Sequence, residues 1–160
     1  MMFYTTFDTP FCKIILVGTQ DGISGLHLET GEGKRKFTIG DDWVRDENIF
    51  TDTKKKIEAY FSGKLQYFSV PLQLHGTDFQ KSVWTALLDI PFGEVQTYGE
   101  VAAAIGNKKA CRAVGMANSK NPIPLIIPCH RVIGANGSLT GFAHGLSMKH
   151  KLLEFERQHR

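Results

Sequence analysis

The sequence predicts an α/β protein in two parts, a small N-terminal β-sheet domain with a helix and a mostly helical C-terminal domain. Three observations lead to this prediction. Short segments rich in β-branched and aromatic residues occupy the start of the chain. Helix-capping motifs recur after residue 76. The charge balance also changes between the two parts. We expect the domains to span residues 1–75 and 76–160.

The N-terminal part is expected to form a β-meander followed by one helix. The spacing of Ile57 and Phe61 predicts a helix over residues 51–61, and Gly63 is expected to end it. Nothing in the first 65 residues has the pattern of a catalytic group. Three segments have the composition of strands and are separated by turn-forming dipeptides: residues 3–7, 13–17 and 23–28.

Two capping boxes mark helix starts in the C-terminal part. Thr77 is followed three residues later by Gln80, and Thr97 is followed by Glu100. In this arrangement each side chain accepts a hydrogen bond from a backbone N–H that is otherwise free at the helix start. We therefore expect a helix after Thr77 that ends before Pro91, and a shorter helix after Thr97.

A helix-turn-helix is expected next. The helix after Thr97 is predicted to stop at Gly106, and a third helix is predicted to be capped by Asn107 and to run to about Ser119. Two short helices joined by a tight turn are typical of this DNA-binding motif. The third helix combines small residues with Arg112, which favours close approach to DNA, although tight packing in a core gives the same pattern.

The most informative segment is residues 124–133, which is expected to be a buried, extended stretch that contains a Pro-Cys-His sequence. A buried thiol has a raised pKa and stays inert unless a proton acceptor and an orienting group lie beside it. Cys129 followed by His130 is therefore a candidate nucleophile with its own base, although an isolated pair of this kind is more often structural. Afterwards we expect a tight turn at Asn136-Gly137 and a final helix over residues 147–157.

The charge distribution indicates a polyanionic partner. Residues 1–75 carry nine Lys/Arg and ten Asp/Glu, a sum of −1, whereas residues 76–160 carry ten and six, a sum of +4. No acidic residue occurs between Val101 and Leu153. Such a one-sign stretch is expected of a nucleic-acid-binding protein, although an ordinary solvated basic face gives the same pattern. The basic residues of this span are Lys108, Lys109, Arg112, Lys120, Arg131, Lys149 and Lys151.

Cysteine usage and hydropathy indicate an intracellular protein. The three cysteines have no close spacing, which argues against a disulfide framework and for a reducing compartment. The chain has no apolar run long enough to span a bilayer, and its first residues lack the layout of a signal peptide. We expect a cytoplasmic protein without membrane contact.

Five motifs follow one another in the second half of the chain. They are Gly76-Thr77-Asp78-Phe79-Gln80, Ile90-Pro91-Phe92-Gly93, Arg112-Ala113-Val114-Gly115, Asn121-Pro122 and Pro128-Cys129-His130-Arg131-Val132-Ile133-Gly134. In this order and spacing they are highly specific. Over about residues 76–156 the sequence resembles the O6-alkylguanine-DNA alkyltransferases, also called methylated-DNA–protein-cysteine methyltransferases.

The resemblance implies a ribonuclease H-like N-terminal domain and a winged-helix or helix-turn-helix-like C-terminal domain. It implies DNA repair by direct reversal, in which the alkyl group of O6-alkylguanine, and of O4-alkylthymine, passes once and stoichiometrically to Cys129. The partner would be double-stranded DNA with alkylated bases. The protein would be a monomer with no cofactor and no metal, associated with the nucleoid in a bacterium or with the nucleus in a eukaryote.

The resemblance also implies roles for individual residues. Cys129 would accept the alkyl group, and His130 would take the thiol proton through a bridging water. Glu156 would orient the imidazole of His130 and stabilise its cation. Asn121 would hold the turn before the cysteine, and Tyr98 would donate a hydrogen bond or proton that helps guanine leave.

Two further sets of residues follow from the resemblance. Arg112 would fill the base stack after the damaged nucleotide is flipped out, and the carbonyls of Cys129 and Val132 would meet the guanine amino group. Phe142 stands where the family usually has Tyr, and His144 where Gly is common, which affects the range of alkyl groups accepted. The other expected DNA-binding residues are Ala113, Gly115, Lys108, Lys109, Lys120 and Arg131. The expected pocket residues are Val132, Phe142, Ala143 and Met116, with the amide near Ala143 meeting O6.

Other functions fit the sequence less well. A zinc nucleobase deaminase needs a second cysteine where Val132 stands, so two thiolate ligands cannot be assembled. A thiol hydrolase needs a distant histidine and an oxyanion hole, and no motif for either is evident. A non-enzymatic binder or sensor of alkylated DNA stays the main alternative, although the presence of Cys129 argues against it.

Overall fold

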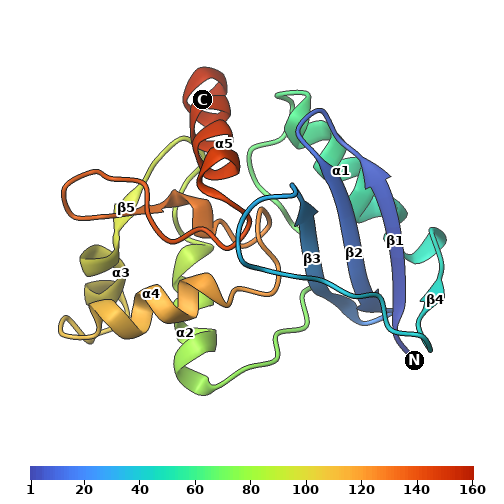
Figure 1. Ribbon diagram of the computed structural model, residues 1–160, viewed down its shortest axis with the longest axis horizontal. Coiled ribbons are helices and arrows are strands. Elements are labelled where there is room, and N and C mark those ends of the chain that lie inside the picture. The colour runs from blue at the N-terminus through green and yellow to red at the C-terminus, as the bar shows by residue number, and fades with distance from the viewer.

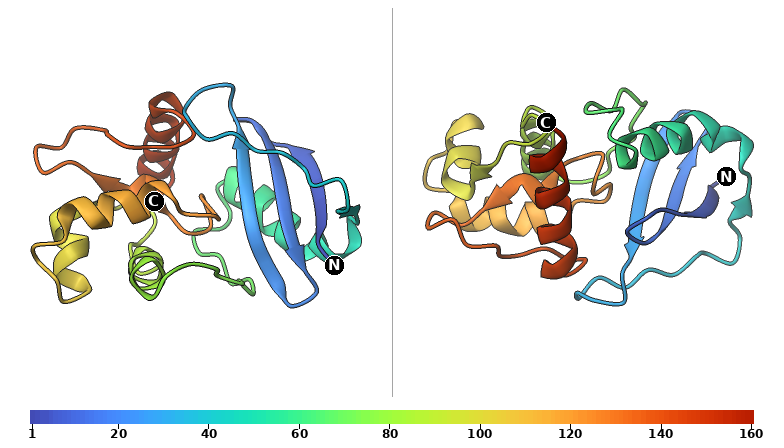
Figure 2. Two further views of the ribbon diagram at one scale, coloured as in Figure 1. Left: turned by 60° about the horizontal axis from the view of Figure 1, so that its bottom comes forward. Right: turned by 90° about the horizontal axis from the view of Figure 1, so that it is seen from above.

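The N-terminal part forms a four-stranded sheet with one helix against it. The computed structural model describes residues 1–160, the whole chain. The strands have the order β3-β2-β1-β4, in which β1 pairs antiparallel with β2 and parallel with β4. The helix α1 lies across one face of this sheet (Figures 1 and 2). The elements are β1 (Phe3–Asp8), β2 (Lys13–Thr19), β3 (Gly22–Glu29), β4 (Val44–Arg45), the 3-10 turn η1 (Asn48–Phe50) and α1 (Thr51–Phe61).

The C-terminal part is mostly helical, as the sequence predicts, and holds a small two-stranded parallel sheet of β5 and β6. Both predicted capping boxes are present, at Thr77 and Thr97. The helices of this part surround the short sheet on the side of the molecule away from β1 (Figure 1). The elements are α2 (Asp78–Leu87), β5 (Gln96–Thr97), α3 (Tyr98–Ala104), α4 (Cys111–Ser119), the 3-10 turn η2 (Cys129–Arg131), β6 (Val132–Ile133) and α5 (Leu146–His159).

Three local expectations are corrected. Helix α4 begins at Cys111, because Asn107 closes a turn with its backbone carbonyl, which accepts from the N–H of Ala110, and caps no helix. Residues 124–133 are not one extended stretch: they fold into turns before β6. The turn at Asn136-Gly137 forms, with Gly137 at a φ of 82°, but no strand follows it and no hairpin results.

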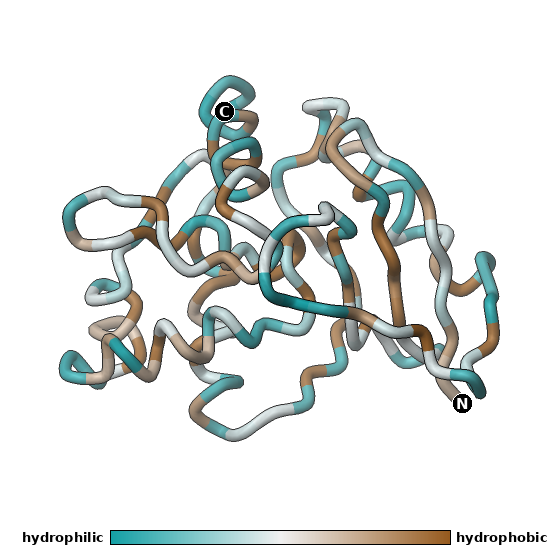
Figure 3. Tube along the Cα trace, in the orientation of Figure 1, coloured by the Kyte–Doolittle hydropathy of each residue, from teal (hydrophilic) through white to brown (hydrophobic).

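One hydrophobic core runs through both parts of the molecule. A single cluster of 27 buried residues includes Leu16 of β2, Tyr60 of α1 and Leu152 of α5. The apolar run along β2 is visible in the hydropathy-coloured tube (Figure 3). The parts also share backbone hydrogen bonds, since the N–H of Leu26 in β3 donates to the carbonyl of Pro122 at 2.9 Å. The sheet is therefore fixed against the segment that leads to Cys129.

The helices give no indication of membrane insertion, since none combines the length and the apolar character that a crossing of the bilayer requires.

Candidate active site

Cys129 is the first residue of η2 and is 4% exposed. The turn that leads to it is braced by the side chain of Asn121, which accepts from the N–H of Ile123 at 2.9 Å and donates to the carbonyl of Ile127 at 2.8 Å. Between them Leu125 adopts a φ of 75°, an unusual conformation for a residue with a side chain. Asn121 thus supplies the hydrogen bonds that hold a strained turn in front of the thiol.

Burial raises the pKa of the Cys129 thiol above its ordinary value. A hydrogen bond from Asn121 and the positive charges of Lys149 and Arg35 act in the opposite direction without reversing the effect. The resting side chain is therefore a neutral thiol at physiological pH. A reaction of this sulfur as a nucleophile requires a base that removes the proton.

His130 lies directly after the thiol and is completely buried. Its Nε2 lies 2.7 Å from Oε2 of Glu156, the carboxylate on α5. Because the carboxylate can only accept, Nε2 carries the ring proton and Nδ1 has a free lone pair. Nδ1 is buried and has no hydrogen-bond partner within the protein. Burial lowers the pKa of His130 despite the nearby carboxylate, so the ring is neutral at rest and available as a base.

Glu156 is the centre of a buried hydrogen-bond network and is itself completely buried. Burial acts to raise its pKa, but His130 and Arg131 outweigh that effect and hold the pKa of this carboxyl well below its usual range. The hydroxyl of Tyr60 also donates to Oε2 at 2.5 Å, and the N–H of Gly93 donates to Oε1 at 3.3 Å. Glu156 is consequently a fixed carboxylate with its acceptor positions occupied.

Arg131 belongs to this network and does not reach the surface. It is 6% exposed, and its Nε and Nη2 donate to the two oxygens of Glu156 at 2.8 and 3.0 Å. Its Nη1 donates to the carbonyl of Ile90 at 2.6 Å. The role in DNA binding expected for Arg131 is therefore contradicted, because its charge is used inside the protein to balance Glu156.

Lys149 and Tyr98 attach the loop after β6 to the site. Nζ of Lys149, which is completely buried, donates to the carbonyls of Val132 at 2.5 Å and of Thr140 at 2.7 Å. The half-buried Tyr98 donates from its hydroxyl to the same Thr140 carbonyl at 3.1 Å. Burial lowers the pKa of Lys149 to about 8, and the lysine remains positively charged at neutral pH beside Cys129.

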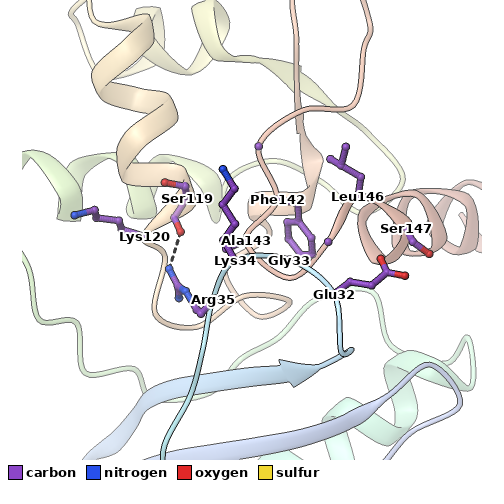
Figure 4. A pocket seen from close by; sticks show the side chains of 12 residues that line it. Glu32, Gly33, Lys34, Arg35, Ser119, Lys120, Phe142, Ala143, Leu146 and Ser147 are labelled. Atoms are coloured by element: carbon purple, nitrogen blue, oxygen red, sulfur yellow. Dashed lines mark hydrogen bonds between the residues drawn. The ribbon is translucent and has the colours of Figure 1, made fainter.

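A cavity of about 820 Å³ opens between the N-terminal part and this loop (Figure 4). Phe142 and Ala143, two of the expected pocket residues, line it. Val132 is fully buried and does not line it, and Met116 is 62% exposed on α4 and lies outside the cavity. The pocket assignment of Met116 is therefore not supported, and its place is with the exposed residues of that helix. Cys129 does not line the cavity either.

Residues 27–35 of the N-terminal part hold the walls of the cavity. Nη1 and Nη2 of Arg35 donate to the carbonyls of Asn121 and Ser119, both at 2.6 Å, and thereby cap the end of α4 (Figure 4). Its N–H donates to the carbonyl of Ala143 at 3.1 Å. A Cβ on Gly33, whose φ is 80°, would lie 2.2 Å from the same carbonyl oxygen, so this close approach requires glycine.

His144 is buried and contacts His27 of β3 with 3.3 Å between Nε2 of His144 and Nδ1 of His27. The carbonyl of His144 also accepts from the hydroxyl of Thr30 at 2.7 Å. Burial, with further contributions from His27 and Arg35, lowers the pKa of His144 to about 3. His144 is a neutral link between the sheet and the cavity loop, and its side chain does not line the cavity.

The basic residues expected to bind DNA form an exposed surface around the turn and α4. Lys108 and Lys109 lie in the turn after α3, and Lys120 follows the end of α4. Arg112 and Ala113 are exposed at the start of α4, and Gly115 is half-buried on the same helix against the ring of Tyr98. This surface faces away from the sheet and ends beside the cavity, where Lys120 is one of the lining residues (Figures 1 and 4).

Sequence reasoning missed the contributions of the N-terminal part and of one polar side chain near Cys129. Tyr60 belongs to the predicted helix over residues 51–61 but was not singled out, and Arg35 lies in a polar loop. Both contacts join residues far apart in the chain, and no local pattern indicates them. Asn118 is buried next to Cys129 and donates to its backbone carbonyl at 3.4 Å. The one available signal is that these side chains are polar while their neighbours are apolar, since a polar residue in a buried segment usually has a specific partner.

Comparisons with known proteins agree over the whole chain. Residues 78–158 match the model of the 6-O-methylguanine DNA methyltransferase DNA-binding domain, and residues 2–74 match the ribonuclease-like domain of the same family. The methylated-DNA–protein-cysteine methyltransferase of Methanosarcina acetivorans is 51% identical over 97% of this chain and 98% of its own length. The one of Mycobacterium tuberculosis is 45% identical over 98% of this chain and 93% of its own length.

Solved structures show the same likeness. A crystal structure of Mycobacterium tuberculosis OGT in complex with DNA superposes with a TM-score of 0.90 and 44% identity, and the match covers 98% of this chain and 94% of that one. The Mycobacterium tuberculosis O6-methylguanine methyltransferase gives a TM-score of 0.89 at 43% identity, with 100% and 95% covered. The resemblance suggested by the five sequence motifs is thus confirmed, and this chain belongs to the 6-O-methylguanine DNA methyltransferase family.

Proposed function

We propose that the protein repairs O6-methylguanine in DNA by moving the methyl group to Sγ of Cys129 in a single turnover. The main support for this assignment is the buried arrangement of the Cys129 thiol, the His130 imidazole and the Glu156 carboxylate. Nε2 of His130 lies 2.7 Å from Oε2 of Glu156, and Nδ1 of His130 has no hydrogen-bond partner within the protein. A neutral thiol next to a neutral histidine is the starting state that base-assisted nucleophilic attack requires.

The proton leaves Cys129 before or during the attack. His130 accepts it at Nδ1, through a bridging water, and becomes an imidazolium. Nε2 of the ring already donates to Glu156, and the carboxylate therefore stabilises the new charge as it forms. The positive charge of Lys149 further favours the thiolate over the thiol.

The thiolate then attacks the methyl carbon in line with the C–O6 bond. The S–C bond forms as the C–O6 bond breaks, and the electron pair of that bond goes to the guanine. A proton from a hydrogen-bond donor at the base makes guanine a neutral leaving group, and Tyr98 is our candidate for this donor. The product on Cys129 is a thioether, and no group in the site can cleave it. Each protein molecule therefore reacts once.

DNA binds, in this proposal, on the exposed basic surface of α4 and the turn before it. Phosphate neutralisation by lysines and Arg112 supplies salt-dependent affinity without sequence preference. A buried thiol cannot reach a base inside a duplex, so the damaged nucleotide must be extruded toward Cys129. Arg112 at the start of α4 can fill the space that the base leaves. O4-methylthymine presents a methyl group on a comparable exocyclic oxygen and is a second substrate of this site.

The alternative is a binder that flags alkylated DNA without repairing it. The test is to mix the protein with a duplex that carries one O6-methylguanine, measure its intact mass and map the modified peptide. We expect the mass to rise by one methyl group that replaces hydrogen, located on Cys129, and to saturate at one per protein. Cys129→Ala should bind the duplex and gain no mass. Binding without any gain of mass in the unaltered protein would establish the alternative.

A further inference from the structure

Three buried polar atoms lack a hydrogen-bond partner within the protein, and two of them lie in residues that flank the nucleophile. One is Nδ1 of His130, whose use as a base explains why it is free. The other is Oδ1 of Asn118, which is 2% exposed. A buried amide oxygen without a partner is costly for the folded protein, and such an atom is expected where a ligand completes the hydrogen bond. The reaction steps proposed above make no use of it.

Asn118 stands between the DNA-facing helix and Cys129. It lies near the end of α4, six residues after Arg112, and points inward. Its Nδ2 donates to the backbone carbonyl of Cys129 at 3.4 Å, which fixes the orientation of the amide. A flipped amide would place its oxygen against that carbonyl, and two acceptors repel each other. The oxygen is therefore the atom that stays free.

The neighbouring carbonyls are already engaged. The carbonyl of Cys129 accepts from both the backbone N–H of Val132 and Nδ2 of Asn118. The carbonyl of Val132 accepts from Lys149 at 2.5 Å. A carbonyl oxygen has two lone pairs, so that of Cys129 is fully used, while that of Val132 keeps one. The family resemblance assigns the guanine amino group to these two carbonyls. With the Cys129 carbonyl occupied, the two N–H groups of the amine can be accepted by the Val132 carbonyl and by Oδ1 of Asn118, whose amide contacts Cys129.

We infer that Asn118 is a specificity-determining residue that accepts a hydrogen bond from the exocyclic amino group of the extruded O6-methylguanine. This inference rests on the proposed function and adds the group that selects the base. O6-methylguanine carries an N2 amino donor on the edge beside N1. O4-methylthymine has a carbonyl oxygen in the comparable place, which would face Oδ1 as a second acceptor. The residue therefore favours the guanine lesion over the thymine lesion.

The test removes each partner of the hydrogen bond in turn. Asn118→Leu keeps the shape of the side chain and deletes its polar atoms. O6-methylhypoxanthine is the same methylated base without the 2-amino group. Single-turnover rates are measured at limiting protein for both proteins on otherwise identical duplexes, and O4-methylthymine is added as a third substrate. Since a buried hydrogen bond of this kind is worth about tenfold in rate, we expect unaltered protein to prefer O6-methylguanine over O6-methylhypoxanthine by at least roughly that factor.

In Asn118→Leu this preference should fall by about fivefold or more, and the rate on O4-methylthymine relative to O6-methylguanine should rise. Ser82→Ala on α2 is the matched control, because the exposed hydroxyl of Ser82 donates only to the carbonyl of Phe79 within the same helix and does not line the cavity. It should keep the preference of the unaltered protein. A purely structural role for Asn118 would slow all substrates equally and leave the preference unchanged, and that result would overturn the inference.

The two proposals fail in different ways. If the unaltered protein transfers methyl from O6-methylguanine but shows the same preference as Asn118→Leu, the inference about Asn118 is wrong and the proposed function stands. If the unaltered protein transfers no methyl group from any of the substrates, both proposals are wrong. That the Asn118→Leu protein is folded is verified by its thermal unfolding curve.

Discussion

At the scale of single residues, the decisive group is Glu156. It balances the charge of Arg131, and in the proposed mechanism it also stabilises the imidazolium of His130. Glu156→Gln keeps the volume and removes the charge. We expect single-turnover transfer to slow by about 100-fold or more, because the imidazolium of His130 loses its counter-charge. Rapid-quench kinetics measures this rate. Glu154→Gln on the same helix, where the carboxylate pairs with exposed Arg157, should leave the rate within about twofold.

The same substitution changes how stability depends on pH. The pKa of Glu156 is lowered in the folded protein, so the unfolded chain binds more protons below the ordinary carboxyl range. The stabilisation from this group is complete above that range and is lost as the pH falls through it. Urea unfolding between pH 7 and pH 4 should therefore show a flatter profile in Glu156→Gln than in the unaltered protein. Equal slopes would contradict the assigned charge state.

At the scale of elements, the loop after β6 is held from both sides. Lys149 and Tyr98 fix it from the C-terminal part, while His27, Thr30 and Arg35 fix it from the sheet side. None of these contacts involves an exposed ion pair, and the loop therefore has a defined position although it contains little regular structure. The walls of the cavity depend on this arrangement.

The histidine contact makes that arrangement sensitive to acid. His144 has a pKa of about 3 in the folded protein and an ordinary value in the unfolded chain. Folding therefore loses free energy as the pH drops below about 6.5, by about 1 kcal/mol at pH 5.5 for this group. His144→Asn should lose about 1 kcal/mol less between pH 7.5 and 5.5, measured by urea unfolding. His150→Asn, an exposed position on α5, is the control and should behave like the unaltered protein.

The sequence predicted the elements of local origin and missed those set by distant contacts. Strands β1 to β3, helix α1 and both capping boxes follow from patterns of a few residues, and the structure has them in place. The run of Ile and Leu before Cys129 has the composition of a strand, but the side chain of Asn121 folds it into a turn. Asn107 looks like a helix cap, yet its carbonyl closes a turn and the helix starts later.

The candidate site shows the same division. Cys129, His130, Asn121 and Glu156 were expected, because they belong to the motif-bearing half of the chain. Tyr60 reaches Glu156 across 96 positions and His27 reaches His144 across 117, and no periodicity or motif connects them. Arg131 was misjudged because a basic side chain near a DNA-binding element is usually exposed. Only the buried position of its partner Glu156 reveals that its charge is used internally.

At the scale of the whole molecule, the N-terminal part supplies a hydrogen bond to the candidate site in the C-terminal part. Tyr60 of α1 donates to Glu156 in the shared core. Tyr60→Phe removes this hydrogen bond and leaves the ring in place, so we expect stability to fall by about 1.5–3 kcal/mol and transfer to slow. Tyr67→Phe, at a tyrosine that is 73% exposed in the connecting segment, should change neither. Urea unfolding and rapid-quench kinetics test both variants, and identical behaviour of the two would disprove the connection.

The continuity of the core has a consequence for how such proteins can be recombined. A chimera joined near residue 75 would carry every motif of the reactive half from one parent and the sheet from another. The combined halves would have to keep three hydrogen-bonded contacts: His27 with His144, Arg35 with the end of α4, and Tyr60 with Glu156. We therefore expect a functional chimera only from parents that share those three contacts, because the two halves act as a matched pair.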